Sequence, residues 1–245
     1  MLDFSNSKIL IVGDVMLDKY YFGKVDRISP EAPVPIVNIQ KEESRLGGAS
    51  NVANNIVSLG GHSLLCGVIG HDLFGKEIER ISRHKNIDTF LLKTSSPTIT
   101  KARIIGGKQQ IVRVDYEDKS ELNADNKKLF RDTISRILPE YDILVISDYG
   151  KGLISEDLCR YLIKLAHKYD KKVIIDPKGK NWEKYSGADI VTPNVKELSD
   201  IVGYTVPNTD RAIEKAAREA ITNNHLTALL VTRSDKGMSL IGPIP

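Results

Sequence analysis

Short apolar runs that end in small or polar residues recur along this chain and constrain its fold more than any other feature. Four of them are residues 8–12 (KILIV), 142–146 (DILVI), 172–175 (KVII) and 228–231 (ALLV). Runs of this length are typical of parallel strands buried on both faces. Residues 155–168 and 209–223, which lie between the later runs, carry apolar side chains at helical spacing. This alternation predicts an α/β fold with a doubly wound, mostly parallel sheet flanked by helices.

Two other segments indicate extended chain outside this sheet. Residues 20–39 contain three prolines, which disfavour a helix. Residues 98–115 alternate apolar and polar side chains around Gly106 and Gly107, which predicts a half-exposed hairpin. We expect the two segments to form a small β lid over the main sheet.

The composition excludes several classes of protein. The 245 residues are enough for one α/β domain with a small subdomain. The net charge of +3, without a basic cluster that contains aromatic residues, predicts no nucleic-acid partner. We also expect no membrane span and a cytoplasmic location, because no apolar run approaches the length of a bilayer. Cys66 and Cys159 lie far apart in apolar stretches, which predicts buried thiols rather than metal ligands.

Polar residues and glycines follow the first predicted strand, where ligands bind in open α/β sheets. Asp14 comes directly after Gly13, and its carboxylate would accept hydrogen bonds from sugar hydroxyls; a turn with solvated acids explains it equally well. Gly47 and Gly48 precede small residues and Asn51 at an expected helix start. Glycines there allow a ligand to approach free N–H groups, although a tight loop is the simpler interpretation.

Two other glycine motifs imitate nucleotide-binding loops. Residues 70–77 (GHDLFGKE) nearly match a P-loop, but Glu77 stands where a magnesium-binding Ser or Thr is required, which excludes it. Residues 150–155 (GKGLIS) resemble a dinucleotide fingerprint in which Ser155 replaces the third glycine. A dinucleotide-binding domain therefore stays as an alternative.

Two later motifs suit a nucleotide with magnesium. Asn194 and Glu197 lie three residues apart at an expected helix start, where they would hold a hydrated Mg²⁺; a capping pair explains them at least as well. Thr232, Ser234 and Gly237 follow the run at 228–231 and would line a nucleotide site, unless they only form a connecting turn.

Taken in order, these motifs resemble the ribokinase-like (PfkB) carbohydrate kinases over essentially the whole chain. The run GGASNVANNIVSLG is similar to the first signature of the family, and DPKG, TPNVKE and VTRSDKGM follow in the family's order. The segments RISPEAPVP and SDYGKG resemble the heptose-phosphate kinase branch. The resemblance implies the ribokinase-like fold, with ATP and Mg²⁺ as cofactors.

The resemblance also implies a reaction and its residues. ATP would phosphorylate the anomeric C1 hydroxyl of heptose 7-phosphate, in the synthesis of ADP-heptose for lipopolysaccharide core. The implied sugar contacts are Asp14, Gly47, Gly48 and Asn51. The implied ATP contacts are Asn194, Val195, Lys196, Glu197, Thr232, Ser234 and Gly237, with Asn194 and Glu197 at magnesium through water. We assign Arg103 and Lys151 to the 7-phosphate, because a dianion needs cations. The lid of such kinases often also builds a homodimer.

The catalytic base is the exception. In the family it is the Asp of a Gly-Ala-Gly-Asp motif that follows the VTRSDKGM region, and residues 1–245 contain no such motif. The resemblance therefore implies a base beyond Pro245. We expect residues 1–245 to be a single kinase domain that lacks its C-terminal segment, with little kinase activity alone. Another sugar kinase of the family and a non-catalytic nucleotide- or sugar-binding module are the alternatives.

Overall fold

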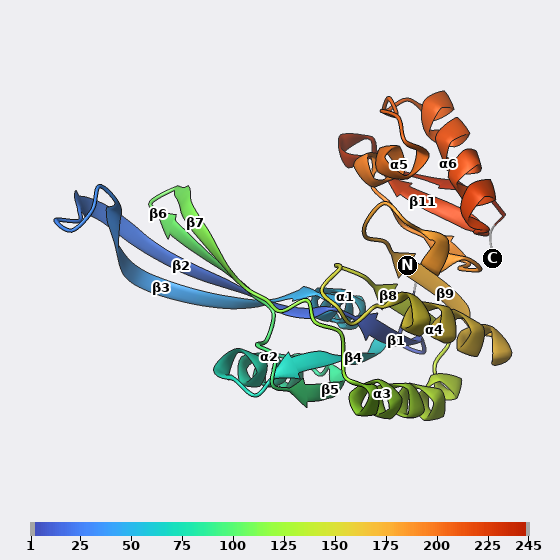
Figure 1. Cartoon of the computed structure of the whole chain (residues 1–245), viewed down its shortest axis with the longest axis horizontal. Helices are drawn as coiled ribbons and strands as arrows, with labels where there is room; N and C mark the ends of the chain where they lie inside the picture. Colours follow the sequence, from blue (N-terminus) through green and yellow to red (C-terminus); the bar gives the residue numbers. More distant parts are fainter. Residues whose placement is uncertain (1–2, 244–245) are drawn as a thin grey trace.

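The main sheet of this protein has eight strands in the order β12-β11-β10-β9-β8-β1-β4-β5 (Figure 1). The computed structural model describes residues 3–243. The strands of this sheet are β1 (Lys8–Gly13), β4 (His62–Gly70), β5 (Asp88–Thr94), β8 (Ile143–Ser147), β9 (Lys172–Asp176), β10 (Ile190–Val191), β11 (Ala228–Thr232) and β12 (Met238–Ile241). Neighbours pair in parallel except β12, which is antiparallel to β11. The four apolar runs are β1, β8, β9 and β11, so the predicted parallel sheet is confirmed.

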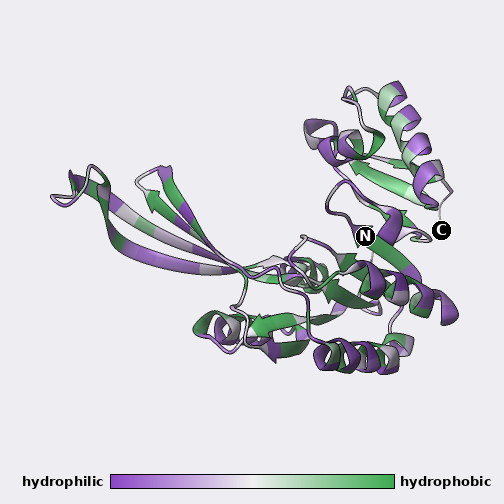
Figure 2. Cartoon of the chain, in the orientation of Figure 1, coloured by the Kyte–Doolittle hydropathy of each residue, from purple (hydrophilic) through white to green (hydrophobic). Residues whose placement is uncertain are grey.

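Helices cover both faces of this sheet. They are α1 (Ala49–Ser58), α2 (Leu73–His84), α3 (Ala124–Ile137), α4 (Glu156–Lys168), α5 (Val195–Val202) and α6 (Asp210–Asn224), with short 3-10 turns at Leu138–Glu140, Glu183–Tyr185 and Ser234–Lys236. Alternate side chains of β1 divide between two cores: Ile9 and Ile11 pack with α1 and α2, whereas Leu10 and Val12 pack with α3 and α4. The strands of the body are accordingly apolar along their length (Figure 2).

A second sheet, called the lid below, projects from the body (Figure 1). Its order is β3-β2-β6-β7, from β2 (Val15–Ile28), β3 (Pro35–Gly48), β6 (Thr100–Gly106) and β7 (Gln109–Tyr116). The predicted hairpin of β6 and β7 is confirmed. The extended chain predicted at 20–39 is longer in the structure, where β2 and β3 pair from Val15 to Gly48. The sequence did not show these additional strand residues, because many of them are charged and pair across the two strands, as Lys19 does with Glu42.

Side-chain hydrogen bonds fix two of the segments that connect the lid to the body, the outgoing connector at 95–99, between β5 and β6, and the returning connector at 117–123, between β7 and α3. Asp72, the N-cap of α2, accepts hydrogen bonds from the Gly75 N–H (2.8 Å) and from both the N–H (2.8 Å) and the hydroxyl (2.7 Å) of Thr98. Asp118 accepts a hydrogen bond from the Ser96 hydroxyl at 2.9 Å and so joins the outgoing connector to the returning one. The base of the lid is therefore attached to α2 and to its own second connector.

Cys66 and Cys159 are buried and free, as predicted. Burial raises the pKa of Cys159 to about 12. Among residues 3–243, no helix combines the length and the apolar character needed to span a membrane.

Candidate active site

Asp14 lies at the carboxyl end of β1, in the single-residue junction that leads into the lid. Its side chain accepts hydrogen bonds from the backbone N–H groups of Tyr149 (2.8 Å) and Lys151 (3.1 Å). Burial raises its pKa despite these donors. The Ala49 N–H donates to the Asp14 carbonyl at 3.0 Å. The start of α1 is thus held directly beside the carboxylate.

The close packing of the backbone requires glycine at positions 47 and 48. Gly48 has φ +55°, and a Cβ there would lie 2.4 Å from the Asp14 carbonyl oxygen. A Cβ on Gly47 would lie 2.6 Å from Oδ2 of Asp18. The glycine pair therefore allows β3 and α1 to pass against the first residues of β2. Asn51 is exposed in the first turn of α1.

The inner face of the lid continues this site with charged side chains. Arg103 donates to Asp18 at 2.6 Å, and its guanidinium lies 5.2 Å from the centre of the Tyr20 ring. Asp18 is in turn the residue that approaches Gly47. Arg103 and Gly47, which are far apart in sequence, are therefore brought together through Asp18.

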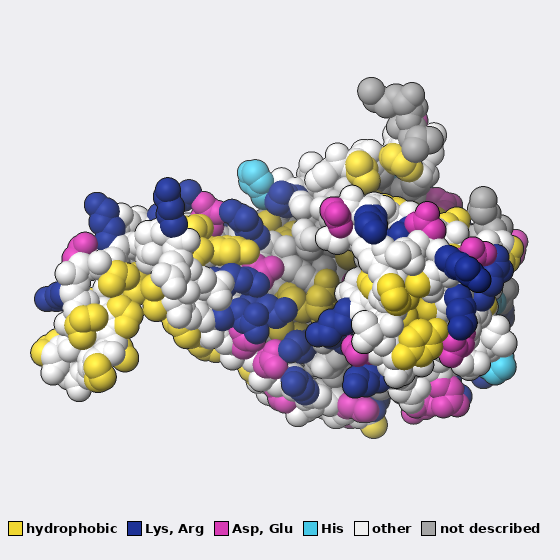
Figure 3. All heavy atoms as spheres, turned by 90° about the horizontal axis from the view of Figure 1, so that it is seen from above, with side chains coloured by type: hydrophobic (Ala, Val, Ile, Leu, Met, Phe, Trp, Pro, Cys, Tyr) yellow, Lys and Arg dark blue, Asp and Glu magenta, His cyan; other side chains and the backbone are white. Residues whose placement is uncertain are grey.

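Lys101 is a cation of this face that we did not predict. Its ammonium group lies 5.8 Å from the centre of the Tyr149 ring, at the end of β8. No ion-pair partner of Lys101 occurs in the part of the chain that the structure describes, and burial, with the charges of Lys151 and Arg113, lowers its pKa. Its spacing of two from Arg103, which places both side chains on one face of β6, was the signal available in the sequence. Figure 3 shows Lys and Arg side chains gathered where the lid joins the body.

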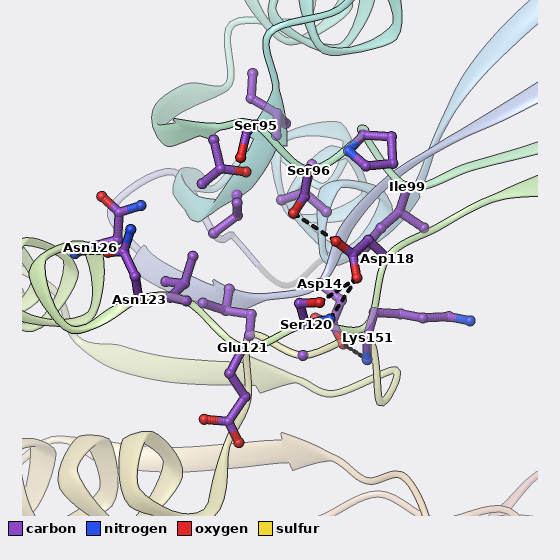
Figure 4. A pocket seen from close by; sticks show the side chains of 18 residues that line it. Asp14, Ser95, Ser96, Ile99, Asp118, Ser120, Glu121, Asn123, Asn126 and Lys151 are labelled. Atoms are coloured by element: carbon purple, nitrogen blue, oxygen red, sulfur yellow. Dashed lines mark hydrogen bonds between the residues drawn. The ribbon is translucent and has the colours of Figure 1, made fainter.

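A cavity of about 260 Å³ lies between the two lid connectors and the loop after β8 (Figure 4). Asp14 and Lys151 belong to its wall, whereas Gly47, Gly48, Asn51 and Arg103 do not. Its other polar walls are Thr94, Ser95, Ser96, Asp118, Ser120, Glu121, Asn123 and Asn126. The Lys151 ammonium points away from this cavity, toward the lid (Figure 4). There it pairs with Glu117.

A second cavity, of about 370 Å³, opens at the carboxyl ends of β8 to β11. It is lined by Asp148, Tyr149, Asp176, Pro177, Lys178, Thr192, Asn194, Glu197 and Thr232. Of the predicted ATP contacts, Asn194, Glu197 and Thr232 are in this wall, and Val195, Lys196, Ser234 and Gly237 are outside it. The two cavities are adjacent along the sheet edge, because the loop at 149–151 borders both.

Asn194 and Glu197 form the capping box that the sequence left open as an alternative. Oδ1 of Asn194 accepts from the Glu197 N–H at 2.9 Å, and Oε2 of Glu197 accepts from the Asn194 N–H at 3.0 Å. Oε1 of Glu197 lies 3.7 Å from the Lys178 ammonium. One carboxylate oxygen of Glu197 therefore stays outside the cap and faces the cavity residues.

Asp176 and Asp148 are the other two carboxylates of this cavity, and neither was predicted to bind a ligand. Burial and the nearby charge of Glu197 raise the pKa of Asp176 to about 6. Within residues 3–243 its side chain has no hydrogen-bond partner, whereas Asp148 is bound by the Tyr185 hydroxyl (2.7 Å), the Gly150 N–H (2.8 Å) and Lys184. Asp148 is thus fixed by the fold, and Asp176 is available to a ligand.

This donor set suits a hydrated magnesium ion better than a dehydrated transition metal. The described residues contain no group of three or more His, Cys, Asp or Glu side chains placed to bind a metal. Mg²⁺ keeps several waters and needs only one or two carboxylates together with phosphate oxygens. Glu197 and Asp176 meet that requirement.

The catalytic base is the one predicted element of the site that the structure does not place. The sequence resemblance implies an Asp beyond Pro245, and Pro245 itself lies outside the described residues 3–243. The described chain ends just after β12, whose last residue, Ile241, pairs with Leu229 near the start of β11, whereas Thr232 of the second cavity lies at the other end of β11. The position of the base therefore stays a prediction, and no described residue is assigned its role.

The family model for "pfkB family carbohydrate kinase" matches residues 6–242 of this chain. The chain belongs to the PfkB family of carbohydrate kinases. The loop at 150–155 agrees with this assignment rather than with a dinucleotide site, since the Lys151 N–H is used by Asp14 and the Ser155 side chain caps α4.

Relatives within the PfkB family are similar over nearly the whole chain. The chain is 44% identical over 242 residues to the bifunctional protein HldE of Haemophilus influenzae (strain PittEE), which covers 98% of this chain and 50% of that protein. It is 43% identical over 237 residues to the D-beta-D-heptose 7-phosphate kinase of Bordetella bronchiseptica, 96% of this chain and 74% of that protein. The chain spans about half the length of the HldE proteins that it matches.

Solved PfkB-type structures share the fold. The tetrameric inhibited form of phosphofructokinase-2 from Escherichia coli superposes with a TM-score of 0.78 at 20% identity, covering 98% of this chain and 78% of that one. The mostly parallel sheet, its flanking helices and the ribokinase-like architecture predicted from the sequence are therefore confirmed.

Proposed function

We propose that this chain forms the sugar and ATP sites of a kinase that phosphorylates D-glycero-β-D-manno-heptose 7-phosphate at C1, giving the 1,7-bisphosphate that ADP-heptose synthesis consumes. The observation that carries the proposal is the position of three cations, Lys101, Arg103 and Lys151, around the lid base next to Asp14. The names of the relatives support heptose 7-phosphate as the acceptor.

The acceptor sugar would lie between Asp14 and the lid base. The carboxylate of Asp14 would accept hydrogen bonds from ring hydroxyls, and Gly48 and Asn51 would present N–H and amide groups at the start of α1. The phosphate end would be bound by Arg103 and Lys151, with Lys101 as a third cation. In this orientation C1 would face the neighbouring cavity that holds Asp176 and Glu197.

ATP would place its phosphates in that second cavity. Lys178 would contact phosphate oxygens, and Val195, Lys196, Ser234 and Gly237 would lie along the rest of the nucleotide. Glu197 and Asp176 would hold Mg²⁺ through water, with Asn194 beside them as predicted. When bound, the ion neutralises charge on the phosphate oxygens.

The lid would exclude water from the reacting groups when it closes, which limits hydrolysis of ATP. We also propose that it pairs with the lid of a second copy, because β3 and β7 are edge strands with unpaired backbone groups. The two free buried thiols suit the reducing cytoplasm as the place of action.

The test is calorimetric titration of the chain with heptose 7-phosphate in the presence of magnesium and a non-hydrolysable ATP analogue. We expect Asp14→Asn to weaken sugar-phosphate binding by at least about tenfold, because one buried charge-assisted acceptor is lost. Asp200→Asn, an exposed acid of α5, is the matched control and leaves the affinity unchanged. Absence of heptose 7-phosphate binding by the folded wild-type chain contradicts the proposal.

A further inference from the structure

Lys151, which we assign to the substrate phosphate, is already held by a carboxylate of its own chain. Its ammonium group pairs with Glu117, the first residue after β7, and the two side chains are only 15% and 22% exposed. The interaction joins the returning lid connector to the loop after β8. Glu117 thus takes the position on Lys151 that an anionic ligand needs.

The other charges of the lid base are distributed unequally. Arg103 pairs with Asp18 at 2.6 Å, and Arg113 pairs with Asp115 at 2.7 Å. Lys101 alone has no acidic partner among the described residues. A phosphate bound here would therefore contact the unpaired ammonium group of Lys101. To contact the ammonium group of Lys151, it must displace the Glu117 carboxylate.

A second cation, Lys119, lies near the Glu117 carboxylate. The Lys119 ammonium lies 3.6 Å from the Oε1 atom of Glu117 and is 64% exposed, so it is free to follow the carboxylate. When Lys151 moves to another anion, Glu117 keeps a partner. The exchange leaves the partly buried Glu117 carboxylate with a partner, so it avoids the cost of an unpaired charge that accompanies the loss of an ion pair.

We propose that Glu117 competes with the substrate phosphate for Lys151 and thereby sets the affinity of this subsite for phosphate. A phosphate dianion displaces a carboxylate from an ammonium group, because it carries more charge and more acceptor oxygens, whereas a neutral sugar does not. The Glu117–Lys151 pair therefore lowers the affinity of the subsite for a phosphate group and does not affect the binding of an unphosphorylated sugar. This inference rests on the proposed function, since it assumes a phosphorylated acceptor near Lys151.

The experiment is calorimetric titration of wild type and Glu117→Gln with heptose 7-phosphate and with unphosphorylated heptose, at low salt. We expect Glu117→Gln to bind heptose 7-phosphate about three- to tenfold more tightly, with no change for heptose. The control is Glu79→Gln on α2, which removes an ion pair with Lys93 of β5, away from the subsite, and leaves both affinities unchanged. Weaker or unchanged heptose 7-phosphate binding by folded Glu117→Gln overturns the inference.

A double-mutant cycle separates competition for Lys151 from the general loss of a negative charge. In a Lys151→Met background, competition predicts that Glu117→Gln has no effect, whereas a general field effect survives and overturns the inference. Should Glu117→Gln not fold, Lys119→Gln is the second variant: it strengthens the hold of Glu117 on Lys151 and weakens heptose 7-phosphate binding only while Lys151 is present. Failure of the wild type to bind heptose 7-phosphate contradicts the proposed function instead.

Discussion

The carboxylate of Asp176 is free to bind a cation, and without a cation it lowers the stability of the folded protein. This carboxylate is largely buried, close to Glu197 and unbound within the described chain, and its pKa is raised to about 6. A raised pKa means that the folded protein holds a proton that the unfolded chain releases at the same pH. Ionised Asp176 therefore destabilises the folded state above its folded pKa.

We expect Asp176→Asn to be more stable than wild type at pH 8 by about 2 kcal/mol in the absence of magnesium. The difference in the free energy of unfolding between Asp176→Asn and wild type should decrease as the pH falls from about 6 to about 4, because wild-type Asp176 then becomes protonated. Urea unfolding across this range measures it, with Asp200→Asn as the exposed control. A gap that is independent of pH, or a less stable variant at pH 8, contradicts this account of Asp176.

Single residues were predictable where a motif marked them and hidden where only three-dimensional contact did. Asp14 and Lys151 follow strands, and the Lys151 N–H donates a hydrogen bond to the Asp14 carboxylate. Asp176 stood in a quoted motif without a role, because its lack of a partner depends on which neighbours surround it. The competition of Glu117 for Lys151 involves residues 34 positions apart, which no local pattern records.

Asp72 links two elements, since one carboxylate caps α2 and holds the first lid connector. It accepts one hydrogen bond from Gly75 and two from Thr98. Orientation of the lid strand β6 thus depends on the start of a body helix. The capping box at α5 was readable from sequence spacing, but a carboxylate shared between a helix and a connector was not, because Thr98 is 26 residues away.

We expect Asp72→Ala to reduce the free energy of unfolding by about 1–3 kcal/mol, since it removes an N-cap and leaves Thr98 without its acceptor. Amide hydrogen exchange should accelerate across β6 and β7. Asn123→Ala removes the N-cap of α3 and is the control, because its side chain binds Asn126 rather than the lid. Equal lid exchange in the two variants would show that Asp72 does not anchor the lid.

In the whole molecule the lid projects from the body, and apolar side chains on its surface are exposed to solvent (Figures 1 and 3). Exposed apolar residues of the lid are Val25, Ile28, Val34, Ile39, Ile111, Val112, Val114 and Tyr116. A projecting two-sided sheet with such residues is stabilised by burial against a partner. The sequence indicated a lid but not its reach, because residues 40–48 are too polar to suggest a strand.

We expect Val112→Lys with Val114→Lys to convert a lid-paired dimer into a monomer, because both charges would be buried in the contact. Sedimentation equilibrium measures the change, and Leu59→Lys, at an exposed apolar residue beyond α1, is the control. A monomeric wild type, or a double variant that stays dimeric, rejects pairing through the lid.

We propose that this site binds a seven-carbon sugar phosphate in preference to the acceptors of other PfkB kinases. Side-by-side calorimetric titration with heptose 7-phosphate and fructose 6-phosphate, with magnesium and a non-hydrolysable ATP analogue, measures this preference. We predict that heptose 7-phosphate binds at least about tenfold more tightly, a difference of about 1.4 kcal/mol. Equal or tighter binding of fructose 6-phosphate, or no binding of either sugar phosphate, would contradict the claim.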